Sequence, residues 1–309
     1  MGNLRKGIIF ASITALCWGF LAIGLKVATN RIDPATIVWF RFSVAFLSML
    51  VFHLWKSPSE IKILARPPWT LVVATVCLAW NYMGFMLGVH YMGPGNTQVV
   101  IQSGAITLAL IGIVFFNERV TVRQIVGFSL AIIGMFVFYH NQLGQTHGDE
   151  DQYNLGFFLT LSGGLTWALY AAMQKKLVTR YSTASLNLFL FGLPVLLYLP
   201  FINLSPLLEL SWGWWILLIS LGLNTLISYG TLSLALKFME ASKVSIIIIL
   251  NPIITFLSMA ILAYIEVSWI AAEKFSVLSI AGAIIVLVGA ILVVKKRKQQ
   301  TEIQQENPV

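Results

Sequence analysis

The chain has 309 residues, of which 58% are hydrophobic and 10% are charged; its mean hydropathy is +0.84 and its net charge is +8. Because soluble domains carry roughly 25% charged residues, this composition excludes a soluble domain and indicates a protein whose solvent is lipid. Cys17 and Cys77 both lie inside apolar stretches, where their spacing suits neither a disulfide framework nor a metal site.

Ten apolar segments are long enough to cross a bilayer as helices, which takes about 20 residues each. Since lipid offers the backbone no hydrogen-bond partner, an isolated span must be helical. We therefore predict an all-α integral membrane protein with ten transmembrane helices. In chain order, the predicted spans cover about 7–29, 34–55, 69–90, 95–116, 122–140, 155–177, 185–202, 212–236, 242–264 and 275–294.

The first span follows Arg5 and Lys6, as the apolar part of a secretory signal would. It runs from Gly7 to about Thr29, which is too long for a signal, and no small-residue cleavage site follows it. We expect an uncleaved first helix.

The basic residues predict the orientation. With the N-terminus inside, 16 of the 20 lysines and arginines fall on the cytoplasmic side, as the positive-inside rule requires. Both termini are then cytoplasmic, and the acidic stretch 149–151 faces out. We expect a multi-pass protein of the plasma membrane, in a bacterium the inner membrane. The basic tail is interpreted as a topology signal, in preference to a nucleic-acid patch.

The sequence contains the same unit twice. Residues 16–19 align with 165–168 and Lys26 with Lys175 at an offset of 149, while Tyr82 meets Tyr229 at 147. Each copy holds five spans, and this odd number inverts the second copy, a design typical of transporters. We predict a first repeat at 1–140, an extracytoplasmic linker at 141–154, a second repeat at 155–294 and a cytoplasmic polar tail at 295–309.

Two glycines in the fifth span align with two in the tenth at an offset of 155. Gly127 and Gly134, like Gly282 and Gly289, are seven residues apart, and these two spans contain few polar residues. We predict that the two spans pack closely at the rim of the bundle.

A set of short motifs, in order along the chain, resembles the EamA family of the drug/metabolite transporter superfamily. The motifs are Trp18-Gly19, 40–42, 117–121 with Gly127 and Gly134, Trp167, 238–242, Asn251-Pro252, 266–268, Gly282 and Gly289. The resemblance implies a ten-helix secondary transporter, often an exporter of amino acids or other metabolites. It departs at Gly104-Ala105, which stands where the second copy has Asn251-Pro252, so a break in the fourth span is not predicted by the motif.

Two basic residues within spans are candidate substrate ligands. Lys26 and Arg41 lie on the outer side, against the positive-inside bias, and a charge in a span costs about 2.5–3.5 kcal/mol at its centre. Each also has a structural interpretation, since long basic side chains reach the interface and can bond helix ends.

Amides and aromatic rings form a second candidate set, and each member could instead hold helices together. Their concentration in a few spans favours a central cavity. Pro252 frees backbone carbonyls in the ninth span and indicates either a kink or an unwound segment. The predicted substrate-binding residues, besides Lys26 and Arg41, are Trp18, Trp80, Asn81, Tyr82, Gln98, Gln102, Trp167, Tyr170, Asn224, Tyr229 and Asn251.

Catalytic signatures are absent from the sequence: no span has Asp or Glu in its middle third, and no HExxH or phosphate-binding glycine loop occurs. We expect no enzyme activity, cofactor or metal, and no nucleic-acid partner. The predicted function is export of a small metabolite such as an amino acid by alternating access. The alternatives are efflux or uptake of cationic compounds and, from another class, a membrane enzyme or assembly factor acting on lipid or glycan. The sequence does not determine whether the protein forms a homodimer.

Overall fold

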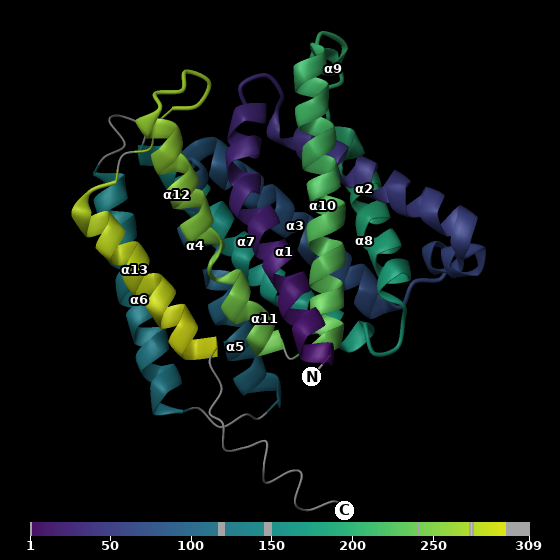
Figure 1. The fold of residues 1–309 in the computed structure, drawn as a ribbon, viewed down its shortest axis with the longest axis horizontal. Coiled ribbons are helices and arrows are strands. Elements are labelled where there is room, and N and C mark those ends of the chain that lie inside the picture. The colour runs from purple at the N-terminus through teal and green to yellow at the C-terminus, as the bar shows by residue number, and fades with distance from the viewer. Residues whose placement is uncertain are drawn as a thin grey trace, which may run out of the picture.

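The computed structural model describes residues 2–116, 121–144, 150–239, 241–271, 273 and 275–294, which form only helices and their connections (Figure 1). Eight of these helices are long and apolar enough to cross a membrane, and a shorter apolar helix covers Val277–Val293. The chain is thus a multi-pass membrane protein. The elements are α1 (Gly2–Ala28), α2 (Pro34–Lys56), η1 (Pro58–Leu64), α3 (Trp69–Met92), α4 (Pro94–Val100), α5 (Ser103–Phe116), α6 (Val122–Leu143), α7 (Glu150–Leu177), α8 (Thr183–Tyr198), η2 (Leu199–Phe201), α9 (Ser205–Leu208), α10 (Trp212–Phe238), α11 (Ala241–Ile248), α12 (Asn251–Tyr264) and α13 (Val277–Val294).

Helix ends follow local capping chemistry. Asp33 accepts a hydrogen bond of 2.9 Å from the Thr36 amide and precedes Pro34 at the start of α2. Thr121 and Gln124 form a reciprocal capping box that opens α6. These caps explain why the structure begins both helices where the sequence predicts spans.

Two of the predicted spans are not continuous. Residues 95–116 divide into α4 and α5 at Ile101 and Gln102, and residues 242–264 divide into α11 and α12 at Ile249 and Leu250. Pro252, in the first turn of α12, has no amide hydrogen to continue the ladder from α11. The first break has no proline; instead the amides of Gln102, Gly104 and Ala105 each donate to the carbonyl three residues earlier, which tightens the turn.

The first helices of the two sequence copies run in opposite directions. At one side of the bundle, Gly7 of α1 lies against Met239, and Lys175 near the end of α7 donates to the Met239 carbonyl at 3.2 Å. At the other side, Lys26 near the end of α1 donates to the His90 carbonyl at 2.8 Å, and Gly156 near the start of α7 packs on Met92. We name the side where α1 begins the lower side and the side where it ends the upper side, as in Figure 1.

Helices of one copy pair with helices of the other. α1 packs along α10, α3 along α7, α2 along α8 and α6 along α13. The first helix of each copy thus lies beside the third helix of the other copy. This exchange places residues of both copies around the centre of the bundle.

The α6–α13 contact confirms the predicted glycine packing. A Cβ atom at Gly134 would lie 2.7 Å from the Val286 amide nitrogen, and one at Gly289 would lie 2.6 Å from that of Ala131. Only glycine lets the two backbones approach this closely. α6 and α13 lie together at one edge of the bundle (Figure 1).

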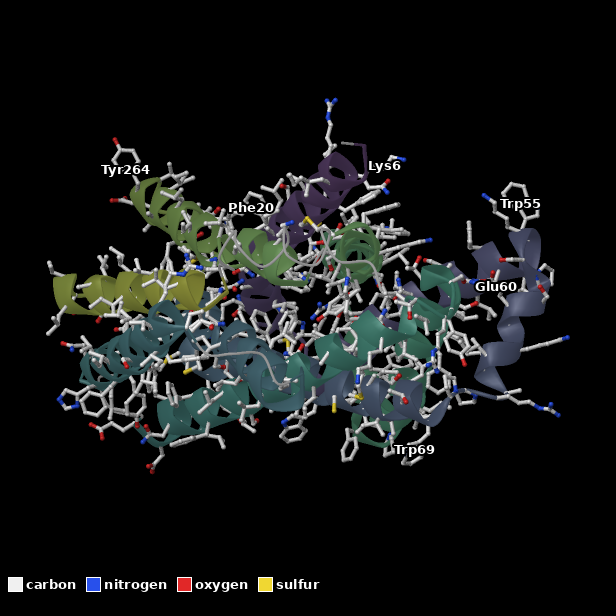
Figure 2. The ribbon with its side chains drawn as sticks, turned by 90° about the horizontal axis from the view of Figure 1, so that it is seen from below. Lys6, Phe20, Trp55, Glu60, Trp69 and Tyr264 are labelled. Carbon is white, nitrogen blue, oxygen red and sulfur yellow. The ribbon has the colours of Figure 1, made fainter. Side chains whose placement is uncertain are left out.

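Large aromatic side chains project from the bundle near the helix ends. Trp55 is 90% exposed near the end of α2 and Trp69 is 77% exposed at the start of α3, both at the lower side. Tyr264, at the upper end of α12, is 88% exposed. Figure 2 shows these three side chains pointing away from the helices, the placement that aromatic belts take at membrane interfaces.

α6 extends to Leu143 and α7 begins at Glu150, so helical residues cover both ends of the segment 141–154 that the sequence predicts as a linker. Residues 145–149, the predicted tail 295–309 and the motif residues 117–120 and Glu240 lie outside the described part of the chain.

Candidate functional site

A cavity lies between the two copies, with about 630 Å³ of space that includes solvent open to its mouth. Both helix breaks border it, through Gln102 at one and Ile248 and Asn251 at the other. Helices α1, α2, α3, α4, α5, α7 and α10 supply the rest of its wall. The lining residues are Trp18, Leu21, Arg41, Asn81, Tyr82, Phe85, Gln98, Ile101, Gln102, Ala105, Trp167, Tyr229, Ile248 and Asn251.

Arg41 is the charged residue of this lining. Its side chain is 2% exposed, its Nε donates to the Thr225 hydroxyl at 3.2 Å, and its guanidinium carbon lies 4.7 Å from the centre of the Tyr82 ring. Within the described residues the one ion pair joins His53 and Glu60, so no carboxylate neutralises Arg41 there. A hydroxyl and a ring face stabilise a buried cation less than a carboxylate does. The cavity wall therefore presents an uncompensated positive charge.

Amide side chains connect the two helix breaks. Gln102 Nε2 donates to Asn251 Oδ1 at 2.9 Å, and Gln98 Nε2 donates to the Trp18 carbonyl at 2.9 Å. Gln98 Oε1 is buried and forms no hydrogen bond with the described residues. Asn81 Nδ2 donates to the carbonyl of Gly163 at 3.0 Å. The amide nitrogens of Gln98, Gln102 and Asn81 are thus engaged within the protein, whereas the buried Gln98 Oε1 has no partner among the described residues.

Aromatic rings form one wall. The ring of Trp18 lies 5.4 Å from that of Tyr229 and 6.2 Å from that of Trp167, while the rings of Tyr82 and Tyr229 are 5.4 Å apart. Such a wall contacts apolar groups and attracts cations weakly through the ring faces.

Four predicted site residues do not line the cavity. Lys26 lies at the upper end of α1, on the His90 carbonyl. Trp80 is 44% exposed and donates to Ser162 at 3.0 Å, and Asn224 donates to the Cys17 carbonyl at 3.0 Å. Tyr170 is buried behind Tyr229, at a ring distance of 6.0 Å. The aromatic wall therefore lacks the Trp80 that the sequence would place in it.

Sequence reasoning missed the apolar part of the lining, which consists of Leu21, Phe85, Ile101, Ala105 and Ile248. Apolar residues look alike in a sequence whether they face lipid, a neighbouring helix or a cavity. Two of these apolar residues could have been predicted from their spacing. Ile101 and Ala105 follow Gln98 and Gln102 by three positions, and residues at this spacing lie on one helix face.

The described residues contain no group of three or more His, Cys, Asp or Glu side chains that could hold a metal ion. The cavity combines one guanidinium, several amides, phenols and apolar side chains. This set can bind and orient a small molecule by charge, hydrogen bonds and apolar contact.

Comparisons with known proteins agree with this architecture. The model of the EamA-like transporter family matches residues 5–140 and again 154–295. A protein of Haemophilus influenzae named "Uncharacterized transporter" is 31% identical over 93% of this chain and 94% of its own length. The inner membrane transporter YhbE of Escherichia coli K12 is 28% identical over 92% of this chain and 90% of its own.

More distant relatives include an Escherichia coli K12 protein named "Probable amino-acid metabolite efflux pump", which is 25% identical over 92% of this chain and 93% of its own. A solved crystal structure of 17% identity superposes with a TM-score of 0.63, covering 94% of this chain and 97% of the other, and supports the fold. With the family model matching both halves of a multi-pass helical bundle, the chain belongs to the EamA-like transporter family.

Proposed function

We propose that this transporter exports a small carboxylate-bearing metabolite, such as an amino acid, by alternating access through the cavity between its two copies. The observation that carries the proposal is Arg41, a buried cation in the cavity wall with no carboxylate partner among the described residues. A substrate carboxylate would supply the missing counter-ion. The distant relative named as an amino-acid metabolite efflux pump agrees with this substrate class.

The topology of the proposal is ten crossings arranged as two inverted five-helix repeats, 1–140 and 155–294. α4 and α5 together make one crossing, as do α11 and α12, because each pair is interrupted only by a two-residue turn. α13 completes the second repeat. The lower side faces the cytoplasm, since that orientation places 16 of the 20 basic residues inside. The linker 141–154 then lies outside, and both termini lie inside.

The helix breaks are the places where the bundle can change conformation during alternating access. Gln102 and Asn251 join the two breaks directly, so a shift of one half-helix pulls on the other. Broken helices around a central site are the usual construction of transporters that rock between two openings. The carboxylate is held at Arg41, and the side chain lies against Ile101, Ala105 and Ile248.

Competition in proteoliposomes tests the substrate class. Unlabelled amino acids should inhibit transport of a labelled amino acid, whereas choline and cationic dyes should not. Strong inhibition by the cations with none by amino acids would favour the second candidate, efflux of cationic compounds, for which the ring cluster of Trp18, Trp167 and Tyr229 is the supporting observation.

A further inference from the structure

The loop between α12 and α13 folds back over the upper side of the bundle. Ile270 of the loop packs against Ile23 of α1 and Met259 of α12, and Asn30 donates to the Trp269 carbonyl at 3.3 Å. Phe275 meets Phe256 edge-to-face, with ring centres 5.1 Å apart. These contacts carry the loop to the start of the half-helix α4.

Glu273 of this loop inserts its carboxylate between two glycines. Its Oε2 accepts a hydrogen bond of 2.8 Å from the Gly95 amide. A Cβ atom at Gly93, whose φ is 89°, would lie 2.0 Å from Oε1, and one at Gly95 would lie 2.4 Å from Oε2. The space that side chains would fill at these positions is occupied by the carboxylate.

The carboxylate is removed from water, and among the described residues it forms no ion pair. Oε1 is buried and has no hydrogen-bond partner among the described residues. Among the described residues, Lys26 is the basic group that acts on Glu273; its ammonium donates to the His90 carbonyl at 2.8 Å and forms no ion pair with Glu273. The groups that act on Glu273 from the packed helices are Lys26 of α1, Asn96 of α4 and Tyr153 of α7, and His90 of α3 adjoins Lys26.

We propose that Glu273 is a proton-binding site that links closure of the upper side of the cavity to pH. The inference rests on the proposed function, because it assumes that the upper side opens during transport. α4 connects the site to the cavity: Gln98, one turn after Gly95, lines the cavity and donates to the Trp18 carbonyl. Releasing Glu273 from Gly95 therefore frees a half-helix that forms part of the cavity wall.

The direction of the linkage follows from burial. Desolvation raises the pKa of Glu273 from 4.5 to about 7, while the Gly95 amide, the Lys26 charge and hydrogen bonding by the side chain and amide of Asn96 act in the opposite direction. The closed conformation therefore binds a proton more tightly than an open conformation in which Glu273 meets water. The proton's contribution to closure is complete below the open-state pKa and is lost as pH rises through about 7. Acid outside closes the upper side, and alkali opens it.

Pulsed EPR distances on the full chain in lipid nanodiscs test the proposal without any substrate. Nitroxide labels at Asp151→Cys and Ser268→Cys, in a background with Cys17→Ser and Cys77→Ser, report the separation of α7 from the loop. The longer distance should gain population as pH rises, with a midpoint between the open-state pKa of Glu273 and about 7. Glu273→Gln, which mimics the neutral acid, should remain at the short distance at every pH. Glu266→Gln, a second glutamate of the same loop, is the matched control and should keep the midpoint.

A Glu273→Gln variant that follows the wild-type titration would overturn the proposal, as would a wild-type distance that does not change with pH. Infrared spectroscopy of the wild type gives a second readout that needs no variant. The band of a neutral carboxylic acid should titrate with the same midpoint as the distance change. Absence of a titrating band would contradict the proton-binding site at Glu273. Arg41→Ala should retain the pH response. The substrate proposal at Arg41 and the proton site at Glu273 can therefore fail independently of each other.

Discussion

Lys26 and Lys175 make the same contact at opposite sides of the bundle. Lys26, near the end of α1, donates to the carbonyl of His90 near the end of α3. Lys175, 149 residues later and near the end of α7, donates to the carbonyl of Leu236 at 2.6 Å near the end of α10. In each copy a lysine of the first helix thus bonds the C-terminal carbonyls of the third, which are partly negative and lack helical partners. This equivalence favours the structural interpretation of Lys26 over a role in binding substrate.

Arg41→Ala should weaken amino-acid binding by about 2–5 kcal/mol, or roughly 30-fold or more, because a buried carboxylate would lose its charged partner. Arg41→Lys should lose less, since the charge remains while the planar donor set is lost. Isothermal titration on purified protein measures both affinities, and thermal unfolding is the control. Unchanged affinity together with a lower melting temperature would assign Arg41 a packing role.

Lys26→Met should move the pH midpoint of upper-side opening to higher pH, because the Lys26 charge lowers the pKa of Glu273. Lys26→Arg keeps the charge and should leave the midpoint near its wild-type value. Lys175→Met removes the equivalent lysine from the lower side and should not shift the midpoint. The EPR titration measures all three, and an equal shift in both Met variants would contradict a local electrostatic effect.

Gly134→Ala and Gly289→Ala should each destabilise the protein by about 1–3 kcal/mol, because the added methyl group meets backbone atoms of the facing helix. Gly230→Ala is the matched control: it lies inside α10 with nothing within 4 Å of its Cβ position, and should be neutral or stabilising by up to about 1 kcal/mol. Unfolding in mixed detergent micelles compares the three variants. Equal effects at all three positions would argue against the α6–α13 contact.

The Gln102–Asn251 bond should show a coupling energy of about 0.6–1.7 kcal/mol in a double-mutant cycle built from Gln102→Leu and Asn251→Leu, the range for hydrogen bonds between membrane helices. Asn251→Leu combined with Trp80→Phe, whose side chain lies outside the cavity, should be additive within about 0.5 kcal/mol. Both cycles are measured by unfolding. Additivity in the first cycle would show that the two breaks are not joined.

Cysteine labelling tests the proposed orientation. In a background lacking Cys17 and Cys77, an impermeant thiol reagent should label Ser268→Cys on intact cells, because the α12–α13 loop lies outside in the proposed topology. Ser59→Cys in η1 should react only after the cells are opened. Both positions are exposed, so access to the reagent differs only by the side of the membrane. The reversed pattern would invert the orientation and with it the side on which Glu273 meets protons.

Several features of this protein were readable from its sequence alone. The apolar segments identified the membrane class, because the length and composition of a span can be read along the chain. The seven-residue glycine spacing predicted the α6–α13 contact, since close backbone approach requires glycine in a fixed register. The sequence offset that pairs Lys26 with Lys175 predicted two related units.

The tertiary structure alone decided which polar residues face the cavity. Lipid is as apolar as a helix interface, so the hydrophobic pattern of a span does not reveal its rotation, and Trp80 was indistinguishable from Trp18. No proline near Gln102 predicts the break between α4 and α5 from the sequence. Glu273, in a loop far along the chain from Gly95, acquires its buried environment only when α13 and α4 are packed together, because desolvation depends on what surrounds a carboxylate in space and not on its neighbours in the sequence.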